Sequence, residues 1–390
     1  MRPVYITADN IITSLGFNTS ENVRSIQNNV IGLKQIEDPS LYPSPITLSR
    51  VNTPELELRF SEVLQKHQKN TAPVSYTRLE KILLVSISDV LSASNINLWN
   101  KRTLFVLSTT KGNIDLLEER YKAQFNHRRI FLWELARVIG AFFGFTLPPV
   151  VISNACISGI LALITASRFI QSGLVDHAVV AGGDIASEFV ITGFQSFQAI
   201  SPAPCKPFDL HRTGLSLGEG AGAMILSAFP KPSVIDQITI AGAATTNDAN
   251  HISGPSRTGE ELGIAIKKAM AAANLTPADI QYISAHGTAT SYNDEMESKA
   301  IAWCDLTKVP VNSFKGYWGH TLGAAGLIES VAAIESLKTN QLFVSAGYHE
   351  CGVPVPINVI TKCETKPLKH ALKMASGFGG CNAAIIYQKS

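Results

Sequence analysis

The sequence predicts an α/β protein in which helices cover both faces of a mostly parallel or mixed β-sheet. Three observations favour this class. Short runs of apolar and β-branched residues recur along the chain, longer segments with helical periodicity separate them, and the short runs alternate little with polar residues. Strands buried on both faces have continuous apolar runs, and strands alternating with helices are typical of layered α/β folds.

The clearest strand candidates are short, almost wholly apolar and bounded by turn residues. They are residues 104–108, 150–153, 178–181, 221–226, 238–241, 282–285 and 383–387. The first residues, up to Ile6, predict an early strand and not a signal peptide, because Asp9 interrupts any apolar segment.

Three longer segments have apolar side chains at helical spacing. They are residues 157–172, 259–273 and 323–339. Residues 36–72 are polar and poorly periodic, so we expect a surface insertion there.

A weak internal repeat divides the chain. Residues 218–222 (GEGAG) lead into one predicted strand, and residues 377–382 (GFGGCN) lead into another. A proline-containing join lies at residues 229–232. We therefore predict two similar halves, residues 1–229 and residues 230–390.

The composition is that of a globular protein with a large core, because 45% of the 390 residues are hydrophobic and only 16% are charged. The net charge of +2 does not indicate a nucleic-acid partner. No apolar run reaches the ~18 residues that a membrane span needs. The six cysteines form no CxxC or CxxH pair, so we expect no metal site, no disulfide bonds and a reduced, cytoplasmic location.

The stretch VVISNACISGILAL, residues 150–163, places Cys156 between a predicted buried strand and a helix. The free N–H groups and the dipole of a first helical turn stabilise a thiolate, so Cys156 is a candidate nucleophile. Gly159 leaves room for another backbone or a ligand. Free cysteines are also among the most buried side chains, and on this stretch alone simple packing is the more common explanation.

A first histidine motif is SAHGTAT, residues 284–290, in which His286 follows a buried strand. Ligands of open α/β sheets bind at such strand ends. Thr288 and Thr290 place hydroxyls at alternate positions, which suits an extended ligand that contains amides. Taken alone, a histidine in this position is more often a structural residue.

A second histidine motif is NSFKGYWGHTLGAAG, residues 312–326. Lys315 lies among apolar residues, where a lysine needs a partner, and Glu329 on the following predicted helix offers one. His320 directly precedes that helix. The glycines around Phe378 in GFGG, residues 377–380, indicate a movable loop with free backbone N–H groups, although an ordinary tight turn would look the same.

The chain resembles the β-ketoacyl-acyl carrier protein synthases in four motifs and in the order of these motifs. They are the cysteine after a buried strand, AHGTAT, the lysine before GHTLGAAG, and GFGG before a final strand. These are the elongating condensing enzymes of fatty acid and polyketide synthesis. KPFD at residues 206–209 and GEGAG at residues 218–222 add to the likeness, which is strong from about residue 100 onward.

The resemblance implies a thiolase-like fold, duplicated in five layers as α/β/α/β/α, and usually a homodimer. It implies condensation of an acyl thioester with malonyl-acyl carrier protein. No metal or cofactor would be bound, because the phosphopantetheine arm of acyl carrier protein, the partner protein, carries the substrates.

The resemblance also implies residue roles. Cys156 would hold the acyl chain as a thioester, while His286 and His320 would promote loss of CO2 from the malonyl group and stabilise the enolate. Lys315 would set the electrostatics of the site together with Glu329.

The loops around the site would bind the rest of the substrate. Thr288 and Thr290 would bind the phosphopantetheine arm, with Gly379 as a further substrate-binding residue. Phe378 would be the gate, and its N–H would join that of Cys156 in an oxyanion hole.

Several positions depart from the family pattern, and the bulky Ile157 raises the open question of whether it changes the floor of the acyl pocket. The others are Asn154, Ser376 and Cys381. Basic residues are the candidates for docking an acidic carrier. They are Arg128, Arg129, Lys206 and Arg212.

Two other functions share the fold. A non-catalytic chain-length partner of another ketosynthase typically lacks the cysteine that this chain retains. A thiolase would use a second active cysteine and would lack the Lys315–His320 pair.

Overall fold

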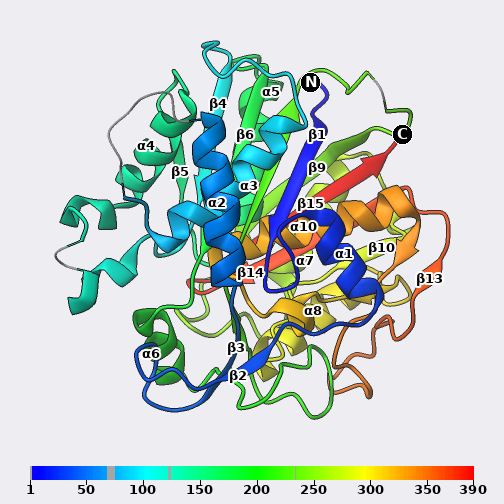
Figure 1. Cartoon of the computed structure of the whole chain (residues 1–390). Helices are drawn as coiled ribbons and strands as arrows, with labels where there is room; N and C mark the ends of the chain where they lie inside the picture. Colours follow the sequence, from blue (N-terminus) through cyan, green and yellow to red (C-terminus); the bar gives the residue numbers. More distant parts are fainter. Residues whose placement is uncertain (1, 68–74, 122–123, 233) are drawn as a thin grey trace.

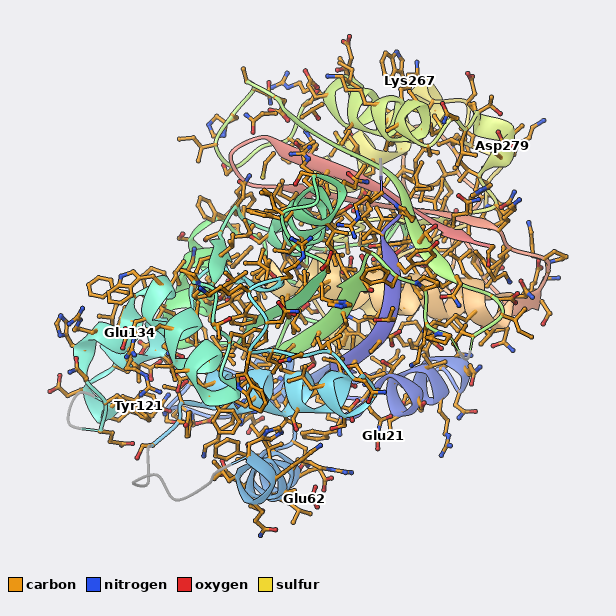
Figure 2. The ribbon with its side chains drawn as sticks, turned by 90° about the horizontal axis from the view of Figure 1, so that it is seen from above. Glu21, Glu62, Tyr121, Glu134, Lys267 and Asp279 are labelled. Carbon is orange, nitrogen blue, oxygen red and sulfur yellow. The ribbon has the colours of Figure 1, made fainter. Side chains whose placement is uncertain are left out.

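The computed structural model describes residues 2–67, 75–121, 124–232 and 234–390. They stack as five layers, α/β/α/β/α, around three main groups of buried apolar side chains (Figure 1). Figure 2 shows the succession of layers from above, with Glu62 on one outer helix and Lys267 on the helix at the opposite side. No helix in the described part of the chain has the length and hydropathy that a membrane span requires.

The helices form three of these layers. One outer layer consists of α2 (Thr53–His67), α3 (Arg78–Ser92) and α4 (Leu132–Phe143). The layer between the sheets consists of α5 (Ser158–Gln171) and α10 (Ala325–Thr339). The other outer layer consists of α7 (Glu260–Ala272) and α8 (Ser291–Trp303).

The two sheets have the same topology. The first, in spatial order, is β5 (Val150–Ile152), β4 (Thr103–Ser108), β6 (His177–Asp184), β8 (Gly220–Ser227) and β1 (Tyr5–Ile12). The second is β11 (Val311–Asn312), β10 (Tyr282–Ser284), β14 (His370–Gly377), β15 (Cys381–Lys389) and β9 (Ile238–Asn247). A short pairing of β1 with β9 joins them edge to edge.

In each sheet the first three strands are parallel and the last two are antiparallel to their neighbours. This equivalence confirms the predicted duplication, whereas a boundary at residue 229 stays a prediction. The segment after β5 leads into α5 and the segment after β11 leads into α10. Because α5 and α10 pack against each other, the duplication brings these two segments together.

The predicted strands and the three predicted helices are all present, but one prediction is wrong. Residues 36–67 are not a surface insertion, because they contain β3 (Ile46–Ser49), which pairs with β7 (Leu217–Gly218), and the whole of α2. Leu56, Phe60 and Val63 of α2 are buried. The apolar face of α2 is narrow and flanked by charged residues, so the helical periodicity is difficult to recognise in the sequence. Residues 68–72 of the predicted insertion lie outside the described residues.

The remaining elements lie around this core. They are α1 (Thr19–Gln27), β2 (Lys34–Ile36), α6 (Glu188–Ser196), α9 (Lys315–Trp318), β12 (Gln341–Leu342) and β13 (Glu364–Thr365), with short 3₁₀ turns at Ile114–Leu117, Glu119–Tyr121, His127–Ile130, Pro277–Asp279 and Leu322–Ala324.

Gly159 is a point of close approach between α5 and α10, because a Cβ built on it would lie 2.5 Å from the backbone nitrogen of Leu327. We expect Gly159→Ala to lower the free energy of unfolding by about 1–3 kcal/mol, the usual cost of overpacking. Urea denaturation measures this change. Gly193→Ala in α6 is the matched control, since a Cβ there would meet nothing within 4 Å. It should stabilise by about 0.5–1 kcal/mol, and equal effects of the two variants would contradict the close crossing.

Candidate active site

The turn between β5 and α5 presents Cys156. The Ser158 hydroxyl accepts a hydrogen bond from the Asn154 N–H at 2.8 Å and donates one to the Ala155 carbonyl at 2.6 Å. Ala155 has a φ of 44°, in the left-handed region that residues with side chains rarely adopt. The turn is therefore strained next to the candidate nucleophile and is closed by the first residue of the helix.

The loop after β10 holds His286 through buried carboxylates on α8. Glu297 accepts the N–H groups of His286 and Gly287 at 2.7 and 2.6 Å. Asp294 accepts the N–H of Thr288 at 3.0 Å. Sequence reasoning missed both acids, although their three-residue spacing just after the SAHGTAT motif would place them on one face of a helix.

A buried cluster of charges lies behind His286. The Lys315 ammonium donates to Glu329 Oε1 and to the His286 carbonyl, each at 2.6 Å, and lies 3.1 Å from His286 Nδ1. Lys373 on β14 lies 2.7 Å from Glu329 Oε2. The predicted Lys315–Glu329 contact is thus present, and Lys373 was missed. A lysine in the strand sequence HALKMASG was the signal that could have found it.

Cys156 and the two histidines converge. The Cys156 Sγ lies 3.0 Å from His320 Nε2. The His286 and His320 rings lie 5.2 Å apart at an angle of 85°. Backbone hydrogen bonds to Ser216 and Gly218 hold His320 against β7. The structure therefore brings one thiol and two imidazoles to a single point.

The protonation of this cluster differs from the sequence expectation. Burial raises the pKa of Cys156 to about 12, although Lys315 opposes the rise. Burial lowers the pKa values of His286 and His320 well below the usual range, with a further contribution from Lys315. Burial therefore favours a thiol beside neutral imidazoles over the thiolate that a first helical turn alone would stabilise. Desolvation of a buried anion outweighs the helix dipole here.

Cys156, His286 and His320 place their sulfur and nitrogen atoms within 4.8 Å of one another, a spacing that a metal ion could bridge. Lys315 and Lys373 lie just behind, and their two ammonium groups oppose the binding of a divalent cation. The prediction that no metal is used stays a prediction.

A cavity of about 450 Å³ opens in front of the cluster. This volume lies in the usual range for small-molecule sites. Its walls include Cys156, both histidines, Thr288, Thr290, His251 and Phe378. Phe378 is 37% exposed, and its ring lies 5.8 Å from that of Phe194 and 5.3 Å from that of Phe197. The three aromatic rings form one side of the opening.

Gly377 keeps the space in front of the Cys156 amide open. A Cβ on Gly377 would lie 3.0 Å from the Cys156 nitrogen. The prediction for Gly379 does not fit the structure, because its N–H donates to the Ile252 carbonyl at 2.6 Å and Gly379 is not among the residues that line the cavity. The loop after β14 uses this amide to hold the loop of Ile252.

Ile157, the bulky departure that follows Cys156, does not line this cavity. It is 1% exposed and packs in the apolar layer between the sheets, outside the cavity lining. Of the other departures, Ser376 lines the cavity and donates to Asn382 at 2.6 Å, whereas Cys381 is buried behind the loop.

Two of the four residues predicted to dock a carrier protein are buried and already have partners within the chain. Arg129 is buried against Glu80. Arg212 is 6% exposed and donates to the Asp209 and Gly352 carbonyls. Arg128 is exposed and lies over the Trp133 ring, and Lys206 is half-buried.

Comparison with known proteins identifies the family of this chain. The family model described as "Beta-ketoacyl synthase, N-terminal domain" matches residues 1–229, and the one described as "Beta-ketoacyl synthase, C-terminal domain" matches residues 238–349. The chain belongs to the β-ketoacyl synthase family. β-Ketoacyl synthases are condensing enzymes of fatty acid or polyketide synthesis, and their thioester substrates are bound to acyl carrier protein.

Individual β-ketoacyl synthases are similar to this chain in sequence and in fold. The 3-oxoacyl-[acyl-carrier-protein] synthase 2 of Staphylococcus aureus is 32% identical over 255 residues, which are 60% of each chain. A chain of the ketosynthase–chain length factor complex of Xenorhabdus doucetiae is 25% identical, with a TM-score of 0.86 over 100% of this chain and 98% of that one. A chain of a type II polyketide ketosynthase in complex with its acyl-carrier protein has a TM-score of 0.82 at 22% identity, covering 99% of each chain. The predicted thiolase-like fold is confirmed.

Proposed function

We propose that this chain catalyses the decarboxylative Claisen condensation of an acyl thioester with malonyl-acyl carrier protein, giving a β-ketoacyl thioester. One observation carries the proposal. A buried thiol, Cys156, lies 3.0 Å from an imidazole, His320, and the second imidazole, His286, lines the same cavity. A nucleophile with an adjacent base performs acyl transfer, and two imidazole N–H donors suit an enolate.

In the first half-reaction, the acyl group moves from the carrier thioester to Cys156. His320 accepts the thiol proton as sulfur attacks the acyl carbonyl, so that an uncharged thiol needs no separate ionisation. The carbonyl oxygen becomes negative, and the backbone N–H groups of Cys156 and Phe378, the proposed oxyanion hole, would stabilise it. The carbon–sulfur bond to the carrier then breaks, and the proton leaves with the carrier thiol.

In the second half-reaction, malonyl thioester loses CO2, and the electron pair of the broken carbon–carbon bond forms an enolate. His286 donates its Nε2–H to the enolate oxygen, and His320 donates to the same oxygen in the tautomer that carries its proton on Nε2. The enolate carbon attacks the acyl carbonyl on Cys156, a carbon–carbon bond forms, and the carbon–sulfur bond to Cys156 breaks. The released thiolate takes up one proton, which balances the reaction.

The acyl carrier protein is the proposed partner, and Thr288 and Thr290 are the proposed contacts of its phosphopantetheine arm. Their hydroxyls lie 2.8 Å apart on the cavity wall. Arg128 and Lys206 are the docking residues retained from the sequence, since both are at least partly exposed.

The residues of the site favour a catalytic ketosynthase subunit over a chain-length partner or a thiolase. The Xenorhabdus doucetiae structure contains both a ketosynthase and its chain length factor, so the fold alone does not separate the two. Cys156 and both histidines favour catalysis here. Among the described residues, Cys156 is the only cysteine on the cavity wall, which disfavours a thiolase with two active cysteines.

The test is a reconstitution with defined carriers. Purified protein, acyl-acyl carrier protein and malonyl-acyl carrier protein should release CO2 and yield a β-ketoacyl-acyl carrier protein, which mass spectrometry detects. A set of saturated, unsaturated and aryl acyl groups identifies the pathway. We also propose a homodimer, and native mass spectrometry of the complex purified from cells distinguishes it from a heterodimer with a second ketosynthase. Co-purification with a second ketosynthase and no activity alone would instead support a chain-length partner.

A further inference from the structure

Lys373 is a fully buried charge outside the cavity that the proposed mechanism does not use. It lies in the middle of β14, and its side chain is 0% exposed. The residues before and after it in β14, Leu372 and Met374, are buried apolar side chains of the sheet. Burying an ammonium is costly unless it is paired and hydrogen-bonded, so this lysine needs a structural or functional reason.

The surroundings of the Lys373 ammonium consist of oxygen atoms. Its Nζ donates to the Ala285 and Met374 carbonyls at 2.9 Å each, lies 3.4 Å from the Ser284 carbonyl and lies 2.7 Å from Glu329 Oε2. A protonated lysine has three donors and no acceptor, which fits a cage of four acceptors. Backbone carbonyls and a carboxylate are also the groups that hold a bare monovalent cation.

We propose that Lys373 is a tethered cation, which positions Glu329 and through it the Lys315–His286 pair. Glu329 lies between the two lysines, with Oε1 at 2.6 Å from Lys315 and Oε2 at 2.7 Å from Lys373. Each oxygen has its own cation, so the carboxylate has a single favourable orientation. Lys315 is thereby held 3.1 Å from His286 Nδ1.

The consequence for His286 is a defined tautomer. Because an ammonium has no acceptor, His286 Nδ1 must accept from Lys315, and the proton of the neutral ring is on Nε2. That is the form with an N–H left for a ligand. Lys373 is therefore a positioning residue for the proposed reaction, on which this inference rests.

Lys373 also contributes to the charge around His286. The groups that face His286 are Lys315 on α9, Lys373 on β14, Glu297 on α8, and Cys156 and His320 from the other loops. Burial is the largest cause of the lowered pKa of His286, and the positive charges of Lys315 and Lys373 together with His320 lower it further. Removal of one positive charge lets this pKa rise. The neutral form is then lost at a higher pH, and the acid limb of the pH–rate profile should move upward.

The first experiment compares Lys373→Met with Lys389→Met in decarboxylation and condensation assays across pH. Lys389 on β15 also donates to a carbonyl, that of Leu337 at 2.7 Å, but it has no contact with Glu329 or His286 among those described. We expect kcat of Lys373→Met to fall roughly 10- to 100-fold, the usual loss when a group that orients a reacting residue is removed. KM should change little and the acid limb should move upward. Lys389→Met should keep the wild-type kcat and pH profile.

The second experiment asks whether a free cation replaces the ammonium. Lys373→Ala empties the oxygen cage, so its thermal midpoint and its activity should rise in potassium or ammonium chloride relative to choline chloride. The wild type should respond to none of these salts. Lys373→Gln, which keeps a donor but removes the charge, takes the place of Lys373→Met if that variant does not fold.

The outcomes separate this inference from the proposed function. A folded Lys373 variant with the wild-type kcat and pH profile, or a Lys373→Ala protein that folds without responding to potassium or ammonium, would overturn the inference. If the wild type neither decarboxylates nor condenses, the proposed function fails. In that case ¹⁵N NMR of His286 still tests the inference about Lys373. The folded Lys373→Met protein is expected to lose the Nε2–H tautomer of His286, and an unchanged tautomer would contradict the inference.

Discussion

Cys156→Ala is expected to lower the rate of condensation by at least about 10⁴-fold, a typical scale for removal of a covalent nucleophile. The acyl group then has no sulfur to occupy, so the first half-reaction does not occur. Decarboxylation of malonyl-acyl carrier protein should continue, because His286 and His320 keep their places on the cavity wall. The two activities should therefore separate in this variant.

The measurement follows CO2 release and β-ketoacyl product in the same reaction, together with the mass of the protein after incubation with acyl-acyl carrier protein. Cys363→Ala is the matched control, since Cys363 is a free, exposed cysteine. It should keep both activities and the acyl adduct. Normal condensation by Cys156→Ala, or an acyl adduct on another cysteine, would show that the nucleophile assignment is wrong.

Replacement of either histidine by alanine is expected to lower the rate strongly, and the two variants should differ in which step they slow. Loss of one N–H donor to a developing oxyanion typically lowers the rate roughly 100- to 1000-fold, so both His286→Ala and His320→Ala should release CO2 slowly. Only His320 lies 3.0 Å from the Cys156 Sγ. His320→Ala should therefore also slow acylation of Cys156, whereas His286→Ala should leave acylation near the wild-type rate.

Rapid-quench mass spectrometry of the acyl adduct measures the first step, and CO2 release measures the second. Equal slowing of acylation in both variants would contradict a specific pairing of His320 with Cys156. A His286→Ala protein with normal decarboxylation would remove the enolate role of His286. Circular dichroism confirms that each variant is folded, which matters because both rings are buried.

The raised pKa of Cys156 makes the neighbouring base, His320, important for acylation. A thiol with a pKa of about 12 contains very little thiolate at neutral pH. Small thiol reagents should then react faster with the exposed Cys363 than with Cys156. An acyl thioester bound in the cavity reacts at Cys156 instead, because His320 removes the proton during the attack. Selectivity for Cys156 thus comes from binding and the adjacent base.

The sequence by itself determined the layered α/β class, the duplication and the main groups of the site. Cys156, His286, Lys315 and His320 lie in short local motifs at the ends of apolar strands, and such motifs keep their meaning without knowledge of the packing. Glu329 was also predicted, because a buried lysine requires a charge partner nearby.

Only the tertiary structure decided how these groups behave. Lys373 comes from a different strand and reaches the site because β14 pairs with β10. The protonation of Cys156 depends on the depth of burial, which no local pattern encodes. Ile157 and Gly379 show the same limit, since one residue packs between the sheets and the other bonds to the loop of Ile252. Contacts between distant segments and desolvation are properties of the packed molecule, and they set the charge and the shape of this site.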